Sequence, residues 1–335
     1  TPIPTETPVT PVIPEKELRV NGNKLSFYVK ESMLKDSWQN YNGFRYYFGS
    51  NGYAYKGTHR IGEKVYVFNE NGHLLRNQKN KMVTVSGQKY YIISKSGNPA
   101  TGYFVYKNNL YYADSKGRCY QNRSRENGQL YFTSSGAAKK NTNALLKMKV
   151  MQTVSSITNS KMNQSQKLRA CWNYITDWSK FNYGGDDPDR SKKGWYRENA
   201  LKMLSSRTGN CYSFACAFAA MAKEVGYKNI KVIIGYDHCW VTINGKHYDP
   251  QAHWSGWIRN IYGLNEYPSG VSIEMFIEDC YHVGGRMPLM MCGPMIRKAV
   301  TRESMMAMYR MQVQRFVDED KYNPWMAPFV VRTGD

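Results

Sequence analysis

The apolar residues of the first part of the chain come in short aromatic stretches, each followed by a turn. Between residues 20 and 141 these units end at glycines that are 20, 25, 20 and 19 residues apart: Gly52, Gly72, Gly97, Gly117 and Gly136. A unit of about 20 residues cannot bury its own apolar face, so the pattern predicts hairpins stacked into an all-β solenoid. Aligning the units gives one shared tyrosine position, expected to form a ladder of rings: Tyr47, Tyr66, Tyr91, Tyr112 and Tyr131.

From about residue 143 the apolar positions recur at helical spacing. Two amphipathic helices are expected within residues 143–181. A third begins after the Gly209-Asn210 turn and ends near Gly226, so Cys211 lies in its first turn. Free N–H groups and the helix dipole favour a thiolate at that position.

Strands follow this helix. Residues 229–237 read as one strand, and residues 238–243 continue it or start a second. Asn244-Gly245 predicts a two-residue hairpin turn, so Trp240 should oppose Asp249 and His238 should be a diagonal neighbour of Asp249. Diagonal Cα atoms lie roughly 7–8 Å apart. A carboxylate at that distance can orient an imidazole, and the imidazole can take a proton from a thiol.

Two other histidines are alternatives for the same role. His253 is the rival base, although no hairpin argument places it, and it is expected beside the cleft with Trp254 and Trp257. His247 opposes Thr242 in the predicted hairpin. It is expected on the opposite side from His238, at the surface.

Three motifs carry a family resemblance: Gly-Asn-Cys-Tyr-Ser-Phe-Ala at 209–215, His-Cys-Trp at 238–240 and Tyr-Asp-Pro at 248–250. They resemble the transglutaminase-like superfamily over roughly residues 150–260. The resemblance implies an α+β, papain-like domain in which Cys211 is the nucleophile, His238 the base and Asp249 the orienting acid. It also implies Tyr183 as a second oxyanion donor beside the Cys211 N–H.

The aromatic units resemble the cell-wall-binding repeats of choline- and glucan-binding proteins over about 100 residues. Those repeats usually open with Gly-Trp, whereas here only Trp38 stands near a unit opening. Trp38, Tyr41 and Tyr55 lie outside the shared tyrosine position and are the candidate wall- or carbohydrate-binding residues. The expected partner of the repeats is a bacterial cell-wall polymer or glycan.

Composition narrows the classes of partner. The 335 residues carry a net charge of +20, which suits an anionic wall polymer or simply promotes solubility. No nucleic-acid motif and no apolar run of about 20 residues is present, so neither nucleic-acid binding nor a membrane span is expected. The seven cysteines form no CxxC pair, and no metal or cofactor is expected. The acidic run of Asp186, Asp187 and Asp189 lacks EF-hand spacing and is interpreted as a solvated loop.

The domain prediction is a Pro/Thr-rich linker over 1–19, hairpin repeats over 20–141 and a catalytic domain over 142–335. The last part of that domain is Met-rich, with nine of the 17 methionines in residues 287–335 and a helix expected over 296–317. The chain opens on Thr-Pro-Ile-Pro rather than Met, which is typical of a processed segment of a secreted, wall-associated protein.

The function predicted from these features is acyl transfer on a peptide or a glutamine carboxamide through a Cys211 thioester. Water as acceptor gives a peptidase or deamidase, which is favoured, and a lysine acceptor gives a transglutaminase crosslink. The alternative is a non-catalytic wall- or carbohydrate-binding protein whose three active-site residues are vestigial.

Overall fold

The computed structural model describes residues 15–234, 238–256, 260–267 and 329–332. The chain divides into two compact units, Thr1–Lys139 and Lys140–Asp335. The first consists of antiparallel β-hairpins and the second is α+β, which is the fold class that the sequence predicts.

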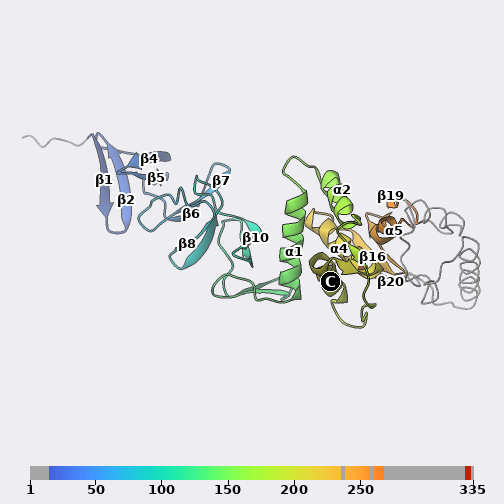
Figure 1. Cartoon of the computed structure of the whole chain (residues 1–335). Helices are drawn as coiled ribbons and strands as arrows, with labels where there is room; N and C mark the ends of the chain where they lie inside the picture. Colours follow the sequence, from blue (N-terminus) through green and yellow to red (C-terminus); the bar gives the residue numbers. More distant parts are fainter. Residues whose placement is uncertain (1–14, 235–237, 257–259, 268–328, 333–335) are drawn as a thin grey trace, which may run out of the picture. The chain divides into compact units, whose positions relative to one another are not determined.

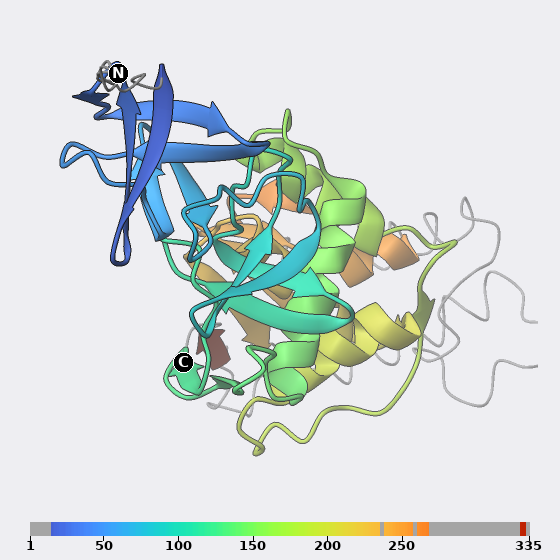
Figure 2. The same ribbon diagram turned by 90° about the vertical axis from the view of Figure 1, so that its left-hand side faces the viewer.

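The first unit is a succession of short hairpins (Figure 1, blue to teal; Figure 2 gives a second direction). It opens with a three-stranded sheet, and five two-stranded hairpins follow in the described residues. The strands are β1 (Lys16–Asn21), β2 (Lys24–Val29), β3 (Ser32–Met33), β4 (Ser37–Tyr41), β5 (Phe44–Phe48), β6 (Gly57–Ile61), β7 (Lys64–Phe68), β8 (Lys81–Val85), β9 (Gln88–Ile92), β10 (Gly102–Tyr106), β11 (Asn109–Ala113), β12 (Arg123–Arg125) and β13 (Leu130–Phe132).

The first strand begins inside the predicted linker. β1 starts at Lys16, and Leu18 pairs with Phe27 and packs against the cluster around it. This apolar contact explains why the chain is ordered before residue 20. Residues 1–14 lie outside the described residues.

The register of the hairpins corrects one predicted position. After each hairpin the chain bridges back to the last residue of its second strand: Phe48 to Ala54, Phe68 to Leu74, Ile92 to Pro99, Ala113 to Cys119 and Phe132 to Ala138. The residue that precedes the bridged strand residue is therefore equivalent in every hairpin. These equivalent residues are Tyr47, Val67, Tyr91, Tyr112 and Tyr131. Tyr66 is wrong as a member of the shared position, because it stands one residue earlier and β-strand neighbours point to opposite faces.

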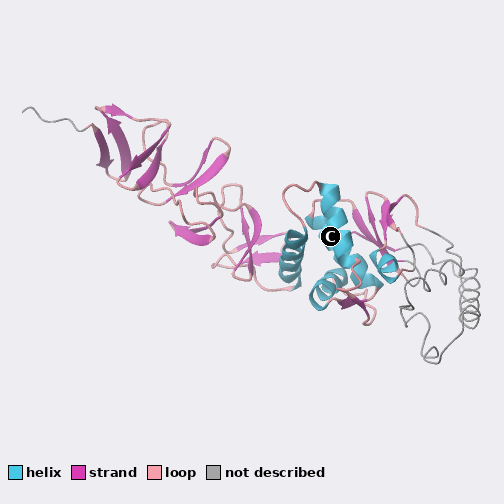
Figure 3. Ribbon diagram, turned by 45° about the horizontal axis from the view of Figure 1, so that its top comes forward, coloured by secondary structure: helices cyan, strands magenta, loops and turns pink. Residues whose placement is uncertain are grey.

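The second unit contains helices α1 (Thr142–Ile157), α2 (Gln164–Ile175), α3 (Trp195–Ser206), α4 (Cys211–Glu224) and α5 (Pro250–Ser255) (Figure 3, cyan). Its antiparallel sheet has the order β19-β18-β17-β16-β20, built from Tyr262–Leu264, Lys246–Tyr248, Cys239–Ile243, Ile230–Ile234 and Phe329–Arg332. A short parallel pair, β14 (Asn182–Tyr183) and β15 (Thr208–Gly209), precedes α4.

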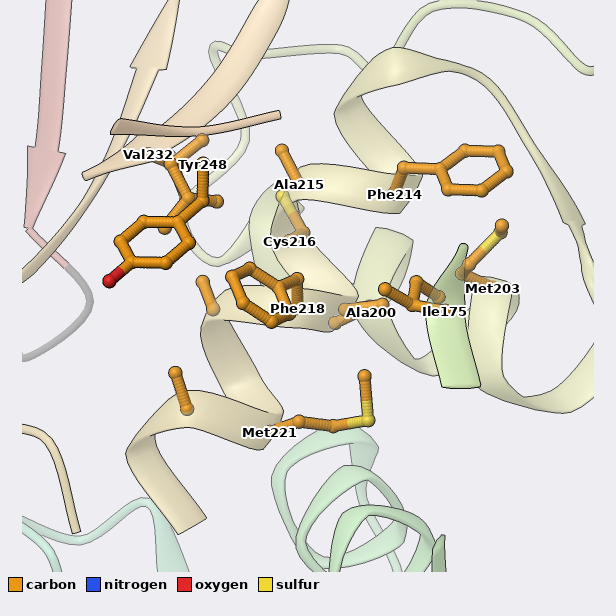
Figure 4. Packing of buried hydrophobic residues seen from close by; sticks show 14 of the residues in the cluster. Ile175, Ala200, Met203, Phe214, Ala215, Cys216, Phe218, Met221, Val232 and Tyr248 are labelled. Carbon is orange, nitrogen blue, oxygen red and sulfur yellow. The ribbon is translucent and has the colours of Figure 1, made fainter. Parts of the chain in front are cut away.

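Helix α4 is the centre of this unit. Its residues Ala215, Cys216 and Phe218 pack between the sheet and helix α3, with Val232 and Tyr248 on one side and Ala200 and Met203 on the other (Figure 4). Eleven of its 14 residues are buried, as expected for a helix that is apolar on nearly all sides. The first turn of α4, and Cys211 with it, is therefore fixed by packing on several sides.

Some sequence predictions fall outside the described residues. These are the helix over 296–317, most of the Met-rich segment, and Trp257. The strand β20 has no counterpart among the predicted elements.

Candidate active site

Cys211 is the first residue of α4 and is 5% exposed. The preceding Asn210 caps the helix by accepting a hydrogen bond from the Ser213 N–H. Its amide group also donates to the Asp187 carboxylate at 2.8 Å. Asn210 thus ties the acidic loop to the start of the helix, a role that the residue pattern of that loop did not reveal.

His238 and Asp249 meet as the hairpin prediction requires. Residues 239–243 form a strand separate from β16, and Ile243 pairs with Lys246 across the Asn244-Gly245 turn. His238 directly precedes β17 and Asp249 directly follows β18. The His238 Nε2 atom contacts the Asp249 Oδ2 atom.

Asp249 is fully buried and accepts three hydrogen bonds. Its Oδ1 atom accepts from the Ala252 N–H at 2.9 Å, which makes Asp249 the N-cap of α5. Its Oδ2 atom accepts from the Tyr267 hydroxyl at 2.7 Å in addition to His238. These three contacts fix the orientation of the carboxylate.

The imidazole of His238 retains a proton over a wide pH range. Burial by itself lowers the pKa of His238, but the charge and hydrogen bond of Asp249, with a hydrogen bond to Cys211, raise it to about 10. Because Asp249 occupies Nε2, Nδ1 is the nitrogen left for the thiol. The arrangement is therefore suited to hold a proton between a sulfur atom and a leaving group.

The structure distinguishes His238 from the two other histidines. The His253 ring packs against Trp172, with centroids 5.3 Å apart, and burial lowers its pKa. His247 accepts a hydrogen bond from the Trp240 Nε1 atom at 3.0 Å. The prediction that His247 lies on the opposite side from His238 is wrong. His238, Trp240 and Thr242 stand at alternate positions and share one face of the strand. His247 pairs directly with Thr242, so it lies on that same face.

Tyr183 lies near the start of α4 because its strand, β14, pairs with β15. It pairs with Gly209 in the β14–β15 ladder, two residues before Cys211. Its ring stacks on Trp254 at 6.4 Å, and Trp254 also packs against Phe214 of α4. Tyr183 as an oxyanion donor remains a prediction.

Tyr267 is the residue that sequence reasoning missed. Besides its bond to Asp249, its ring stacks on Trp240 with centroids 4.2 Å apart. Burial, followed by the Asp249 charge, raises the pKa of Tyr267, so the hydroxyl keeps the proton that it donates. No motif marks this tyrosine, and only the return of the chain beside the hairpin brings it to the site.

The first unit holds two sets of three aromatic side chains, and the members of each set stand at equivalent positions of their hairpins. In each hairpin, the residue at the shared position pairs with a residue of the hairpin's first strand. A third residue, which follows the turn after the second strand, donates its backbone N–H to the carbonyl of the residue at the shared position. These three positions are Trp38, Tyr47 and Tyr55 in one unit, here called the first aromatic cluster, and Tyr103, Tyr112 and Tyr120 in another, the second aromatic cluster. The other units carry non-aromatic residues at one or more of them.

In the first aromatic cluster, Trp38 lies edge-on to Tyr47 at 5.1 Å, and Arg45 lies 4.5 Å above the Trp38 ring. The ring of Tyr55 stacks on His59 at 3.8 Å. Tyr41, by contrast, packs edge-on against buried Phe27 in a different cluster. Trp38 and Tyr55 therefore belong to one group of rings, and Tyr41 does not.

One family model matches part of the second unit. Residues 151–259 match the family model described as "Transglutaminase-like superfamily". This part of the chain is a transglutaminase-like domain. The match contains Cys211, His238 and Asp249 and ends before Tyr267. A search of curated proteins found no match.

Several solved structures align with about 38% of the chain. One is choline binding protein F from Streptococcus pneumoniae, solved in the presence of a peptidoglycan analogue (27% identity, 43% of that chain, TM-score 0.28). Another is the modular Cpl-1 endolysin complexed with a peptidoglycan analogue (25% identity, 38% of that chain, TM-score 0.29). The chain thus spans less than half the length of these proteins.

In the part of the chain that the structure describes, no helix is both long and apolar enough to cross a membrane. Within the same residues, no three His, Cys, Asp or Glu side chains gather as they would around a metal ion. The carboxylate of Asp189 instead accepts hydrogen bonds from Ser191.

Proposed function

We propose that the second unit is a thiol enzyme that transfers acyl groups through a Cys211 thioester. The observation that supports this most strongly is the hydrogen-bonded series Cys211, His238 and Asp249 at the start of a buried helix. A histidine between a thiol and a carboxylate is the arrangement that activates a cysteine nucleophile.

The chemistry follows from this order. The Cys211 sulfur attacks a carboxamide or peptide carbonyl, and the C–N bond breaks as His238 gives its proton to the departing amine. The Cys211 N–H at the helix start supplies one donor to the oxyanion, with Tyr183 proposed as the second. Attack by water then releases the acid and the free thiol, so the favoured activity is peptidase or deamidase, whereas attack by a lysine would form a crosslink.

The test of this activity is selective alkylation followed by a substrate screen. Iodoacetamide at mildly acidic pH should label Cys211 before Cys119, Cys171, Cys216 and Cys239, because burial raises the pKa of each of these four thiols, whereas Cys211 lies at a helix start beside His238. Cys211→Ala should abolish hydrolysis of peptide and glutamine substrates while circular dichroism stays unchanged. Normal turnover by this variant would remove Cys211 from the mechanism, and slow unselective labelling would favour the vestigial alternative.

We also propose that the first unit holds the enzyme on a bacterial cell-wall polymer or glycan. The first aromatic cluster offers ring faces of the kind on which sugars and organic cations pack. Basic residues such as Lys64 and Arg118 add attraction to anionic polymers. Secretion and wall association of the whole protein are part of this proposal.

A further inference from the structure

The second aromatic cluster already contains a cation. The guanidinium of Arg125 lies 3.7 Å from the ring centroid of Tyr112 and 5.5 Å from that of Tyr103. Its Nε atom donates to the Tyr103 hydroxyl at 3.1 Å, and that hydroxyl donates to Glu126 at 2.5 Å. A second guanidinium, of Arg123, lies 4.5 Å from the ring centroid of Tyr120.

The position of Arg125 in the repeat is informative. Arg125 pairs with Leu130 in the last hairpin, and His59 pairs with Tyr66 at the same place in an earlier hairpin. In both cases the side chain reaches back from the following hairpin onto the preceding aromatic cluster. In the first cluster this position holds the imidazole of His59, which stacks on Tyr55, and burial lowers the pKa of His59, so the ring is uncharged at neutral pH. The guanidinium of Arg45 also lies over Trp38 there, but it comes from the hairpin of that cluster itself and not from the following one. In the second cluster the position held by His59 in the first is taken by a permanent cation.

Ring faces attract cations because the π-electrons give each face a negative potential, and a group of several faces is how proteins hold quaternary ammonium ions. A guanidinium at 3.7 Å from a ring centroid occupies the place that such an ion would take. Glu126 adds a negative charge beside the hydroxyl that Arg125 contacts. The surroundings of Arg125 are therefore those of a cation site rather than of a simple apolar core.

We propose that Tyr103, Tyr112 and Tyr120 form a cation site that the chain fills with its own Arg125. In the intact protein this guanidinium fastens the hairpin β12–β13 to β10–β11 and keeps external cations out. Shortening the side chain exposes a site for a small quaternary ammonium ion. The two aromatic clusters thus differ in the side chain that the following hairpin places on them, His59 in the first and Arg125 in the second, although their ring positions are equivalent.

The direct test compares the binding of tetramethylammonium chloride to the full chain and to Arg125→Ala, against sodium chloride at equal concentration. By calorimetric titration, Arg125→Ala is expected to bind one more equivalent than the wild type. Arg118→Ala is the matched control, since it removes a nearby guanidinium that pairs with Asp114 and leaves Arg123 and Arg125 in place, and it should gain no site. Equal tetramethylammonium binding by wild type and folded Arg125→Ala would overturn the proposal.

A second pair of variants does not depend on the folding of Arg125→Ala. Arg125→Lys keeps a cation near the rings, whereas Arg125→Gln keeps much of the length and loses the charge. The thermal midpoint of Arg125→Gln is expected to fall by about 5 °C, in the range produced by one lost contact in a small domain, with Arg125→Lys recovering at least half of this loss. Equal losses in both variants would show that Arg125 acts by packing and would overturn the cation assignment.

Discussion

At the residue scale, Asp249 has two separable roles. One oxygen caps α5 through the Ala252 N–H, and the other faces His238 and Tyr267. Asparagine is as good an N-cap as aspartate, but it carries no charge. Replacing Asp249 with Asn therefore removes the electrostatic partner of His238 while leaving the cap in place.

Asp249→Asn is expected to lower the acyl-transfer rate strongly, since the comparable change costs about 10⁴-fold in serine proteases. It should also change the pH dependence of stability. The pKa of His238 is raised from 6.5 to about 10 in the folded protein. The stabilisation from the pair is therefore complete below about pH 6.5 and is lost as the pH rises through about 10.

Thermal melts of wild type and Asp249→Asn from pH 6 to pH 10 measure this effect. The gap between their midpoints should be widest near pH 6 and should narrow towards pH 10. Asp249→Ala is the control, because loss of the cap adds a destabilisation that persists at every pH. A gap that stays constant for Asp249→Asn would mean that His238 takes its proton affinity from another group.

Tyr267 is predicted to position Asp249 rather than to touch the substrate. Tyr267→Phe removes only the hydroxyl that donates to Asp249, and a hydrogen bond to a charged group contributes roughly 1.5–3 kcal/mol. We expect kcat to fall about tenfold with KM unchanged. Tyr262→Phe, which alters another tyrosine of the same unit, is the matched control.

A double-mutant cycle decides the mechanism of Tyr267. If the hydroxyl acts through the Asp249 carboxylate, Tyr267→Phe should have little further effect in the Asp249→Asn background. Additive losses would instead place Tyr267 in a separate role.

At the scale of elements, the entry into α4 depends on close packing of a glycine. A Cβ atom on Gly209 would stand 2.3 Å from the Cβ atom of Ser213 and 3.0 Å from the sulfur of Met203. The Cβ atom of Ser213 is attached to the backbone of α4, so the clash is relieved only by shifting the first turn of that helix. The absence of a side chain at residue 209 is thus what allows β15 to lead directly into Cys211.

Gly209→Ala is predicted to destabilise the unit by about 1–3 kcal/mol, the usual cost of overpacking, and to slow alkylation of Cys211. Urea unfolding and the iodoacetamide rate measure the two effects. Gly184→Ala serves as control, because its added methyl would meet only the Thr208 side chain, at 3.4 Å. Wild-type alkylation in Gly209→Ala would show that the helix start tolerates displacement.

At the scale of the whole molecule, the proposed attachment to a wall polymer would draw on two forces. The net charge of +20 acts on anionic polymers and weakens as salt shortens the Debye length from about 10 Å at 0.1 M to about 3 Å at 1 M. Stacking on the first aromatic cluster is short-ranged and nearly independent of salt. The contributions of charge attraction and of aromatic stacking to wall binding can be separated by measuring binding at two salt concentrations.

We expect binding of the full chain to isolated walls to fall only partly at 1 M NaCl. The double variant Trp38→Ala with Tyr55→Ala should remove most of what remains, as measured by pull-down with circular dichroism to verify folding. Tyr131→Ala is the control, because Tyr131 is 41% exposed and lies outside both aromatic clusters. Complete loss of wild-type binding at 1 M NaCl would leave charge as the sole force.

The local features of this protein can be read from the order of its amino acids. The Asn244-Gly245 turn, the Asn210 cap and the helix that begins at Cys211 depend on backbone preferences of a few adjacent residues. The turn also sets the register that brings His238 next to Asp249. The repeating glycines indicate hairpins for the same reason, because each marks a turn that its immediate neighbours specify.

Contacts between distant side chains are decided only when the elements pack together. The equivalence of Val67 with Tyr47 follows from bridges between hairpins and strand ends, and not from the spacing of tyrosines. Tyr267 reaches Asp249, and Arg125 reaches Tyr112, because separate segments return to the same place. Such contacts are set by the packing of whole elements, which depends on the summed burial of many side chains and leaves no signature in the spacing of any one segment.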